Sequence, residues 1–224
     1  MLRTLLIALF FLLPAIAQAR PVVIELFTSE ACSSCPPADA LLGRLKQHEP
    51  DLLALDLHVT YWNGSGWTDP FSLAAATKRQ QWYASLGDSE DIYTPEAVVD
   101  GRAEMVGSDR GAILSAIARA RSEAAHSVPL AIVADAESVQ VKVGSGTGTA
   151  TVWLFGFDDS HTTYVRGGEN IGATLTEVNV VRSVNALGTW HGEAGGFRLA
   201  RPAGMHLAVL LQNADGHILG AAAD

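Results

Sequence analysis

Two residues of this 224-residue chain stand out chemically, because Cys32 and Cys35 are its only cysteines and two serines separate them. A cysteine thiolate can attack a disulfide, and a second thiol at this spacing can resolve the mixed disulfide that forms. Two close thiolates can also bind a metal ion, or they can form a bond that only stabilises the fold. The pattern alone therefore allows three kinds of chemistry.

The metal interpretation has little support in the rest of the chain. A structural zinc site usually takes four ligands as two short-spaced pairs. The chain has no second Cys-x-x-Cys, and its seven histidines never occur as His-x3–5-His. We therefore predict neither a metal site nor a cofactor. Copper(I) is less demanding, since two thiolates and one imidazole suffice, and His58 is then the nearest candidate.

A purely structural disulfide is also a weak explanation. Closing a ring of four residues contributes only about 2 kcal/mol on the loop-entropy description. A core of this size does not need such a bond. The redox interpretation fits best, with Cys32 as the nucleophile and Cys35 as the resolving thiol.

The neighbouring residues predict how the pair is held. Val22 to Phe27 is an apolar, β-branched run that indicates a strand buried on both faces. Pro36 and Pro37 suit the first turn of a helix, which the apolar spacing continues to Leu45. Cys32 is then expected near the helix N-cap and Cys35 in the first turn. The free amide groups and dipole at that end favour a thiolate at Cys32.

The N-terminal segment predicts export. Arg3, the apolar run from Leu5 to Leu13 and the small residues before Ala19 form the pattern of a signal peptide that is cut after Ala19. No later run is long enough to span a bilayer, so we expect a periplasmic or secreted protein that is not membrane-embedded after cleavage. Disulfides persist in such compartments.

The overall charge argues against a nucleic-acid partner. The chain has 15 basic and 24 acidic residues, a formal net charge of −9, and no basic run that would neutralise phosphates.

The rest of the chain divides into two parts that differ in their predicted secondary structure. Residues 20–127 alternate strands and helices, including an aromatic, glycine-rich connection and an Asp100-Gly101 hairpin turn. After Val128, strand-like runs recur without a helix, which is typical of an antiparallel sandwich. We therefore predict an α/β domain over 20–127 and a β-rich, sandwich-like domain over 128–224. The runs in the second part are 130–134, 138–143, 149–157, 176–184, 196–200 and 206–212.

The first part resembles a thioredoxin-fold domain. The resemblance rests on the strand VVIELF, the CSSC that opens a helix, a second strand and helix, and the phrase TPEAVVDG. It implies that Pro95 follows a cis peptide bond and faces the CxxC, and that Thr94 receives a substrate segment as an added strand. It also implies that Glu25 is a buried acid that assists proton transfer at the resolving thiol.

The whole chain after the signal peptide is also similar to a family of exported bacterial proteins of unknown function with a thioredoxin-like fold. Four phrases carry this similarity: ELFTSEACSSCPPAD, HVTYWNGSGWTDPF, YTPEAVVDG and GENIGATLTEVNVVR. The resemblance implies a periplasmic location and the two-part organisation, but no substrate.

Other features admit two interpretations. Trp62 and Trp67 can form a substrate-binding rim near the cysteines, or they can be the small core of their own loop. Arg166 to Gly172 is interpreted as a charged surface loop in which Arg166 and Glu169 pair.

These patterns predict a periplasmic thiol–disulfide oxidoreductase that acts on a protein thiol or disulfide and is recycled by an unknown redox partner. The chain lacks the Trp before Cys32 and the Gly-Pro between the cysteines that thioredoxins have, so a narrower client range is expected. The alternatives are a copper(I)-binding chaperone or assembly factor, and a non-catalytic binding module carried by the β-rich part.

Overall fold

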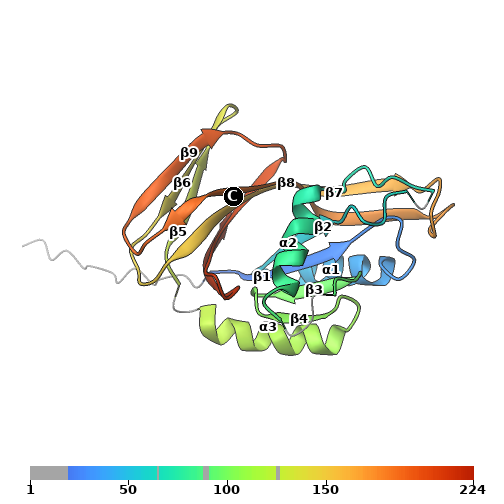
Figure 1. Cartoon of the computed structure of the whole chain (residues 1–224), viewed down its shortest axis with the longest axis horizontal. Helices are drawn as coiled ribbons and strands as arrows, with labels where there is room; N and C mark the ends of the chain where they lie inside the picture. Colours follow the sequence, from blue (N-terminus) through green and yellow to red (C-terminus); the bar gives the residue numbers. More distant parts are fainter. Residues whose placement is uncertain (1–19, 65, 88–90, 125–126) are drawn as a thin grey trace, which may run out of the picture.

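A computed structural model describes residues 20–64, 66–87, 91–124 and 127–224 (Figure 1). The predicted signal peptide, residues 1–19, lies outside the described residues. No helix in the described ranges has the length and apolar character needed to cross a membrane.

The first part of the chain alternates strands and helices as its sequence predicts. Its elements are β1 (Val22–Thr28), α1 (Pro36–His48), β2 (Leu52–His58), α2 (Ala74–Ala84), β3 (Glu96–Val99), β4 (Ala103–Val106) and α3 (Arg110–Ala124).

The second part contains only strands among its described elements. They are β5 (Leu130–Ala134), β6 (Ser138–Val143), β7 (Ala150–Tyr164), β8 (Thr174–Trp190), β9 (Gly195–Ala200), β10 (His206–Gln212) and β11 (Ile218–Ala223). The last of these was not predicted.

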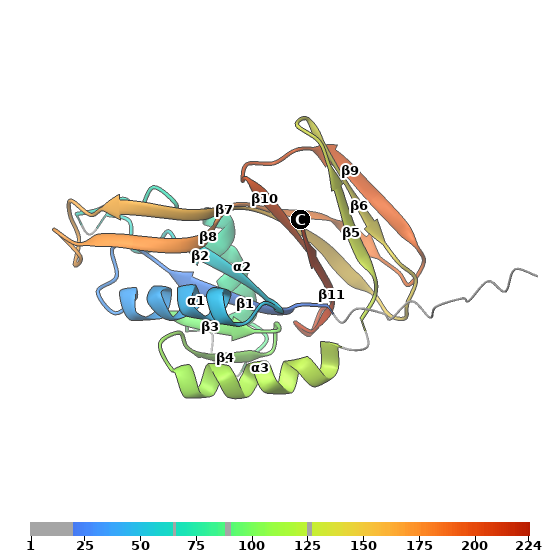
Figure 2. The ribbon, with the colours of Figure 1, turned by 180° about the vertical axis from the view of Figure 1, so that it is seen from behind.

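Strand β1 is central because both of its faces are covered. Ile24 and Leu26 pack with α1 and α3 on one face of the sheet. Val23 and Phe27 pack with α2 on the other face. This two-sided burial explains why the strand reads as a continuous apolar run. Figures 1 and 2 show α1 and α3 on the same side of the sheet, with α2 on the opposite side.

The large sheet runs through both parts of the chain. Its eight strands lie in the order β11-β10-β7-β8-β2-β1-β3-β4. The two parts join where β2 and β8 run parallel, through the single residue pair Asp56 and Val180. The predicted boundary near residue 128 therefore does not separate two independent sheets.

A second, three-stranded sheet covers part of the first. Strands β5, β6 and β9 form it, and its residues share a core with β7, β8 and β10. In β10, Leu207 and Val209 face this core, whereas Ala208 and Leu210 face the α2 side. Two antiparallel layers thus enclose the C-terminal core.

Strands β7 and β8 form a ribbon that is longer than the sequence predicts. The predicted runs, 149–157 and 176–184, end where the apolar pattern ends, but the strands extend beyond them. Strand β7, for example, continues through polar residues such as Thr162, whose hydroxyl is 3.0 Å from that of Thr176. Polar residues can form this half of the ribbon, which includes the end of β7, because it faces little apolar core. The ribbon reaches the end of the molecule at which α1 begins (Figure 2).

Candidate active site

A disulfide joins Cys32 and Cys35 in front of helix α1. The helix begins at Pro36, so the proline pair occupies its first turn as predicted, with Cys35 as the N-cap residue. The carbonyl of Cys35 accepts hydrogen bonds from the amides of Ala38 and Asp39, at 2.8 and 3.1 Å. The cysteines lie slightly earlier than predicted, because Cys35 is the N-cap residue instead of a first-turn residue and Cys32 lies in the loop three residues before it.

Both sulfur-bearing residues are covered. Cys32 and Cys35 are each 0% exposed, whereas Ser33 and Ser34 between them are exposed. A nucleophile has to be reachable by its substrate, and Cys32 is not reachable in this conformation. The groups that cover it come from two distant segments of the chain.

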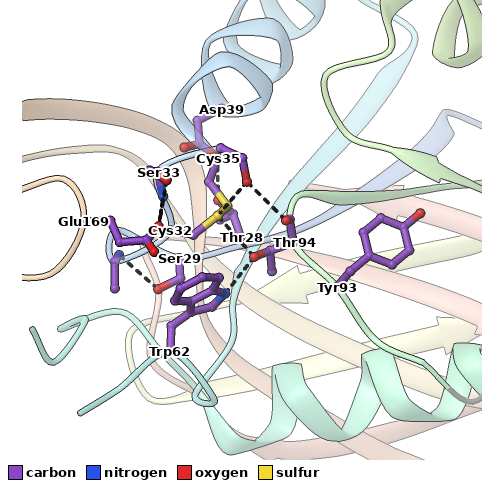
Figure 3. The surroundings of a disulfide bond; sticks show 12 residues. Thr28, Ser29, Cys32, Ser33, Cys35, Asp39, Trp62, Tyr93, Thr94 and Glu169 are labelled. Carbon is purple, nitrogen blue, oxygen red and sulfur yellow. Dashed lines mark hydrogen bonds between the residues drawn. A yellow bond between two sulfur atoms is a disulfide. The ribbon is translucent and has the colours of Figure 1, made fainter. Parts of the chain in front are cut away.

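The first segment is the loop before β3. The peptide bond between Thr94 and Pro95 is cis, as the resemblance implied. The Thr94 hydroxyl lies 3.2 Å from the Cys32 sulfur and donates a hydrogen bond to it. The indole N–H of Trp62 donates to the same hydroxyl at 2.7 Å (Figure 3). Because an indole nitrogen can only donate, Thr94 accepts from Trp62 and directs its own proton at the sulfur.

Ser34 adds a second hydroxyl beside the sulfur. Its oxygen is 3.3 Å from the Cys32 sulfur and 3.4 Å from the Thr94 carbonyl oxygen, to which it donates. The resemblance assigns the backbone of Thr94 to binding a substrate strand, and this role stays a prediction.

The second covering segment is the loop between β7 and β8. Glu169 accepts hydrogen bonds from the backbone N–H and the hydroxyl of Ser33, at 3.0 and 2.7 Å (Figure 3). The side-chain amide of Asn170 donates to the carbonyls of Glu30 and Cys32, at 2.9 and 2.8 Å. The expected surface pair of Arg166 and Glu169 is thus replaced by a contact between Glu169 and the loop of the two cysteines.

Glycine is required where these loops meet. A Cβ on Gly167 would lie 1.9 Å from the backbone oxygen of Gly66. Gly168 has φ +69°, and a Cβ there would be 3.2 Å from the Cβ of Trp67. A side chain at Gly167 would force these two backbones apart.

The two tryptophans predicted to form a rim both lie beside the cysteine loop. Trp62 binds Thr94 as described, and Trp67 donates its indole N–H to the carboxylate of Glu30 at 2.7 Å. Trp62 also packs against the core on the α2 side. Their role in binding a substrate stays a prediction.

Glu25 is not where the resemblance placed it. Its carboxylate is 0% exposed, forms an ion pair with the guanidinium of Arg79 and accepts a hydrogen bond from the hydroxyl of Tyr83 at 2.6 Å. Both partners belong to α2, so the Glu25 side chain lies on the face of the sheet that α2 covers. The face covered by α1 is the opposite one. Glu25 is neither an acid beside the cysteines nor an acid that reaches solvent.

The acid drawn beside Cys35 is Asp39, one turn into α1 (Figure 3). Asp39 is buried and accepts a hydrogen bond from the Thr28 hydroxyl at 2.8 Å. Burial, followed by the charge of nearby Asp56, raises the pKa of Asp39 well above its ordinary value. Sequence reasoning missed it, although it ends the phrase CSSCPPAD.

A sequence profile described as a protein of unknown function, DUF1223, matches residues 23–212. The chain belongs to the DUF1223 family. A crystal structure of a protein from Agrobacterium tumefaciens is similar, with 33% identity, a TM-score of 0.77, and coverage of 92% of this chain and 94% of that one.

A second solved structure, HBP35 of Porphyromonas gingivalis, shares the fold with a TM-score of 0.61 at 13% identity, over 92% of this chain and 75% of that chain. That likeness concerns the fold alone. No curated protein matches the chain.

The four phrases that carried the family resemblance meet around this site in the DUF1223 chain. The first supplies the cysteines and Asp39, and the third supplies Thr94. The second supplies Trp62, which donates a hydrogen bond to the Thr94 hydroxyl at 2.7 Å. The fourth phrase supplies Asn170. The site is therefore built from segments that are far apart in the chain.

Proposed function

We propose that this DUF1223 protein is an exported thiol–disulfide oxidoreductase with a thioredoxin-like first part, and that it exchanges disulfides with a protein substrate through Cys32 and Cys35. The order β1-α1-β2, the disulfide in front of α1 and the cis peptide before β3 support this proposal. So does the general rule that a CxxC in an oxidising compartment suits disulfide exchange.

One observation carries the proposal. The Thr94 hydroxyl donates to the Cys32 sulfur at 3.2 Å, and Trp62 fixes the direction of that donor. A hydrogen bond to an ionised group is about twice as strong as one between neutral groups, so this donor favours a thiolate at Cys32 once the disulfide is opened. Cys35, to which Cys32 is bonded, is the N-cap residue of α1, so the helix N-terminus also lies near the pair.

The exchange can be written from the oxidised pair. A substrate thiolate attacks the Cys32 sulfur, the bond to Cys35 breaks, and Cys35 leaves as a thiolate that takes a proton. A second substrate thiol then attacks the substrate sulfur in the mixed disulfide and releases Cys32. Two electrons and two protons pass from the substrate dithiol to the protein. The same steps in reverse reduce a substrate disulfide.

Access to Cys32 requires a local rearrangement, because the residue is 0% exposed. The contacts of Glu169 and Asn170 with Ser33 and Cys32 hold the β7–β8 loop over the cysteine loop. We infer that a substrate displaces this loop and places its own backbone beside Thr94. This requirement agrees with a narrow client range.

The β-rich part is not a separate module in this proposal, since its longest ribbon contributes Glu169 and Asn170 to the cysteine site. The copper(I) alternative gains no support from the geometry. Among the described residues, the group of three side chains with metal-binding atoms close together contains no cysteine.

A trapping experiment tests the proposal. A Cys35→Ser variant should accumulate mixed disulfides between Cys32 and exported proteins, because the resolving thiol is missing. The matched Cys32→Ser variant should trap none, because the proposal assigns the bond with the substrate to Cys32. If neither variant is ever found in a mixed disulfide, or if both trap equally, the assigned roles are wrong.

A further inference from the structure

A cavity of about 180 Å³ lies where helix α2 meets strands β7 and β8 (Figures 1 and 2). It is lined by Ala75, Lys78, Arg79 and Trp82 of α2, Trp153 of β7 and Val184 of β8. The four helical residues follow the spacing of a single helix face. An engineered cavity of about 150 Å³ in another protein binds benzene, so this cavity has room for one aromatic ring with a small substituent.

The walls of the cavity are apolar and aromatic. Trp82 and Trp153 contribute half-buried indole rings, and Ala75 and Val184 contribute alkyl groups. The guanidinium carbon of Arg79 lies 5.8 Å from the ring centroid of Trp82 and 5.1 Å from that of Trp153. Aromatic rings pack favourably in stacked or edge-to-face arrangements. The walls therefore suit a flat aromatic group.

Arg79 brings a buried donor with no partner to this cavity. The residue is 3% exposed, and its Nε and Nη2 atoms donate hydrogen bonds to Glu25, Tyr83 and Gln212. Its Nη1 atom has no hydrogen-bond partner among the described residues. Buried donors in native proteins are nearly always satisfied. The unused donor therefore indicates an acceptor that a ligand would supply.

The two indoles at the cavity also have unused donors. The N–H groups of Trp62, Trp67 and Trp190 donate hydrogen bonds, whereas those of Trp82 and Trp153 have no partner in the part of the chain that the structure describes. No hydrogen bond therefore fixes the orientation of the two rings that pack against the guanidinium. No side chain in the lining can accept a hydrogen bond, since all its polar groups are donors. A matching ligand must carry the acceptor.

The charge at the cavity favours an anion. Glu25 forms an ion pair with Arg79 and balances its charge. Lys78 is exposed, and it forms no ion pair within the described ranges. Two cations and one anion leave one positive charge at the cavity. A single carboxylate would neutralise this charge and would accept charge-assisted hydrogen bonds from the unused donors.

We propose that this cavity binds a small aromatic carboxylate, with its ring against Trp82 and Trp153 and its carboxylate toward Lys78 and Arg79. The cavity lies on the face of the sheet that α2 covers, and no cysteine lines it. The proposal therefore goes beyond the proposed redox function and does not depend on it.

A larger cavity of about 740 Å³ lacks this chemistry. Its lining includes Arg20 and Asp51, and none of its described lining residues is aromatic. Both Nη atoms of Arg20 donate to Asp100 at 2.6 Å, and Asp51 accepts from Arg121 at 2.7 Å. The charged groups at the larger cavity are thus already paired within the protein.

Nuclear magnetic resonance of the indole N–H groups tests the proposal, on the full chain after signal removal with its disulfide intact. Benzoate should bind with a dissociation constant on the order of 1 mM, as expected for so small a ligand. It should shift the signals of Trp82 and Trp153 and leave that of Trp190 unchanged. Benzamide keeps the ring but not the charge, and should bind about 5-fold more weakly. Cyclohexanecarboxylate keeps the charge but not the flat ring, and should also bind more weakly than benzoate.

Two variants with matched controls locate the site. Ala75→Phe should abolish binding, because the added ring fills the cavity, whereas Ala74→Phe should not, because Ala74 is exposed on the same helix outside the lining. Lys78→Gln should weaken benzoate binding to the affinity of benzamide and leave benzamide binding unchanged. Lys142→Gln, which changes an exposed lysine on β6, should leave both affinities unchanged.

Circular dichroism verifies that each variant folds. If Ala75→Phe does not fold, the comparison of benzoate with benzamide in the wild type and in Lys78→Gln decides. The proposal is overturned if the signals of the two cavity indoles do not move, if all five indole signals move alike, or if benzamide binds as tightly as benzoate. Movement of only the two indoles beside the cysteines would place benzoate at the disulfide and would also overturn it.

Discussion

The side-chain amide of Asn170 donates a hydrogen bond to the backbone carbonyl of Cys32 at 2.8 Å, across a separation of 138 residues in sequence. This contact ties the loop of the β-rich part to the loop that carries the disulfide. Glu169 adds two hydrogen bonds to Ser33 in the same loop, and Cys32 is 0% exposed in this conformation. The reactivity of the disulfide should therefore depend on how often the β7–β8 loop opens.

Asn170→Ala should accelerate reduction of the disulfide by a small dithiol. The substitution removes two hydrogen bonds, each with a net value of about 1 kcal/mol, that hold the loop closed. A loss of about 1–3 kcal/mol corresponds to a 5–150-fold larger open population. The pseudo-first-order rate of reduction, followed by alkylation and mass spectrometry, measures the effect.

Glu193→Ala is the control for that experiment, because Glu193 is exposed on a turn that follows β8. It should leave the rate at the wild-type value. An unchanged rate in Asn170→Ala would show that the loop does not limit access to Cys32.

Thr94→Val should raise the pKa of the Cys32 thiol in the reduced protein. The variant keeps the size of the side chain but loses the hydroxyl that donates to the sulfur. A hydrogen bond to a charged group contributes about 1.5–3 kcal/mol, which corresponds to about 1–2 pKa units. The ultraviolet absorbance of the thiolate as a function of pH measures the shift.

Trp62→Phe provides a graded comparison, because it removes the donor that orients the Thr94 hydroxyl but keeps the hydroxyl itself. Its effect on the Cys32 pKa should be smaller than that of Thr94→Val. Equal pKa values in the wild type and in Thr94→Val would remove the main support for the proposed redox role.

Glu25→Gln should affect stability rather than thiol chemistry. The substitution leaves the buried guanidinium of Arg79 without its counter-charge, which typically costs about 3–5 kcal/mol. Urea unfolding of the oxidised protein measures the loss. The pH dependence of Cys32 alkylation in the folded, reduced variant should match that of the wild type. A shifted pH profile would mean that Glu25 does influence the ionisation of the cysteine.

Local features of the fold could be predicted because neighbouring residues determine them. Asp100 and Gly101 have φ values of 54° and 72°, as expected of an Asp-Gly hairpin turn. Asp109 caps α3 by accepting a hydrogen bond from the amide of Ala112 at 3.0 Å. In both cases the local structure depends on residues that are within a few positions of each other in the sequence.

The placement of Glu25 failed for a reason that concerns strand geometry. Side chains alternate between the two faces of a strand, so one residue of difference in the loop that follows turns an acid to the other side of the sheet. Glu25 shares its face of β1 with Val23 and Phe27, which pack on the α2 side. The acid accordingly faces Arg79 on α2 instead of α1.

The contacts of Glu169 and Asn170 had no local signal. They depend on the parallel pairing of β2 with β8, which involves only Asp56 and Val180, and on a polar ribbon without an alternating apolar pattern. Periodicity can show that a segment is a strand, but it does not show which distant strand pairs with it. Only the phrase GENIGATLTEVNVVR marked this region as part of the family pattern.

Glu96, the residue after the cis proline, should make stability depend on pH. It is 3% exposed, and its carboxylate accepts a hydrogen bond from the side-chain amide of Gln80 at 2.6 Å. Burial raises its pKa from 4.5 to about 7, with a smaller contribution from the charge of Glu104. Between these two values the folded chain holds a proton that the unfolded chain has released.

The free energy of unfolding should consequently fall as the pH rises from about 4.5 to about 7, by at most about 1.4 kcal/mol per pH unit, and this contribution should level off above that range. Glu96→Gln cannot titrate, and its amide oxygen can still accept the hydrogen bond from Gln80. The variant should therefore gain stability relative to the wild type as the pH rises through this range, as urea unfolding at a series of pH values would show. Glu193→Gln, which changes an exposed acid, should follow the wild-type curve. Parallel curves for Glu96→Gln and the wild type would mean that the Glu96 carboxyl ionises in the folded protein as easily as in the unfolded chain.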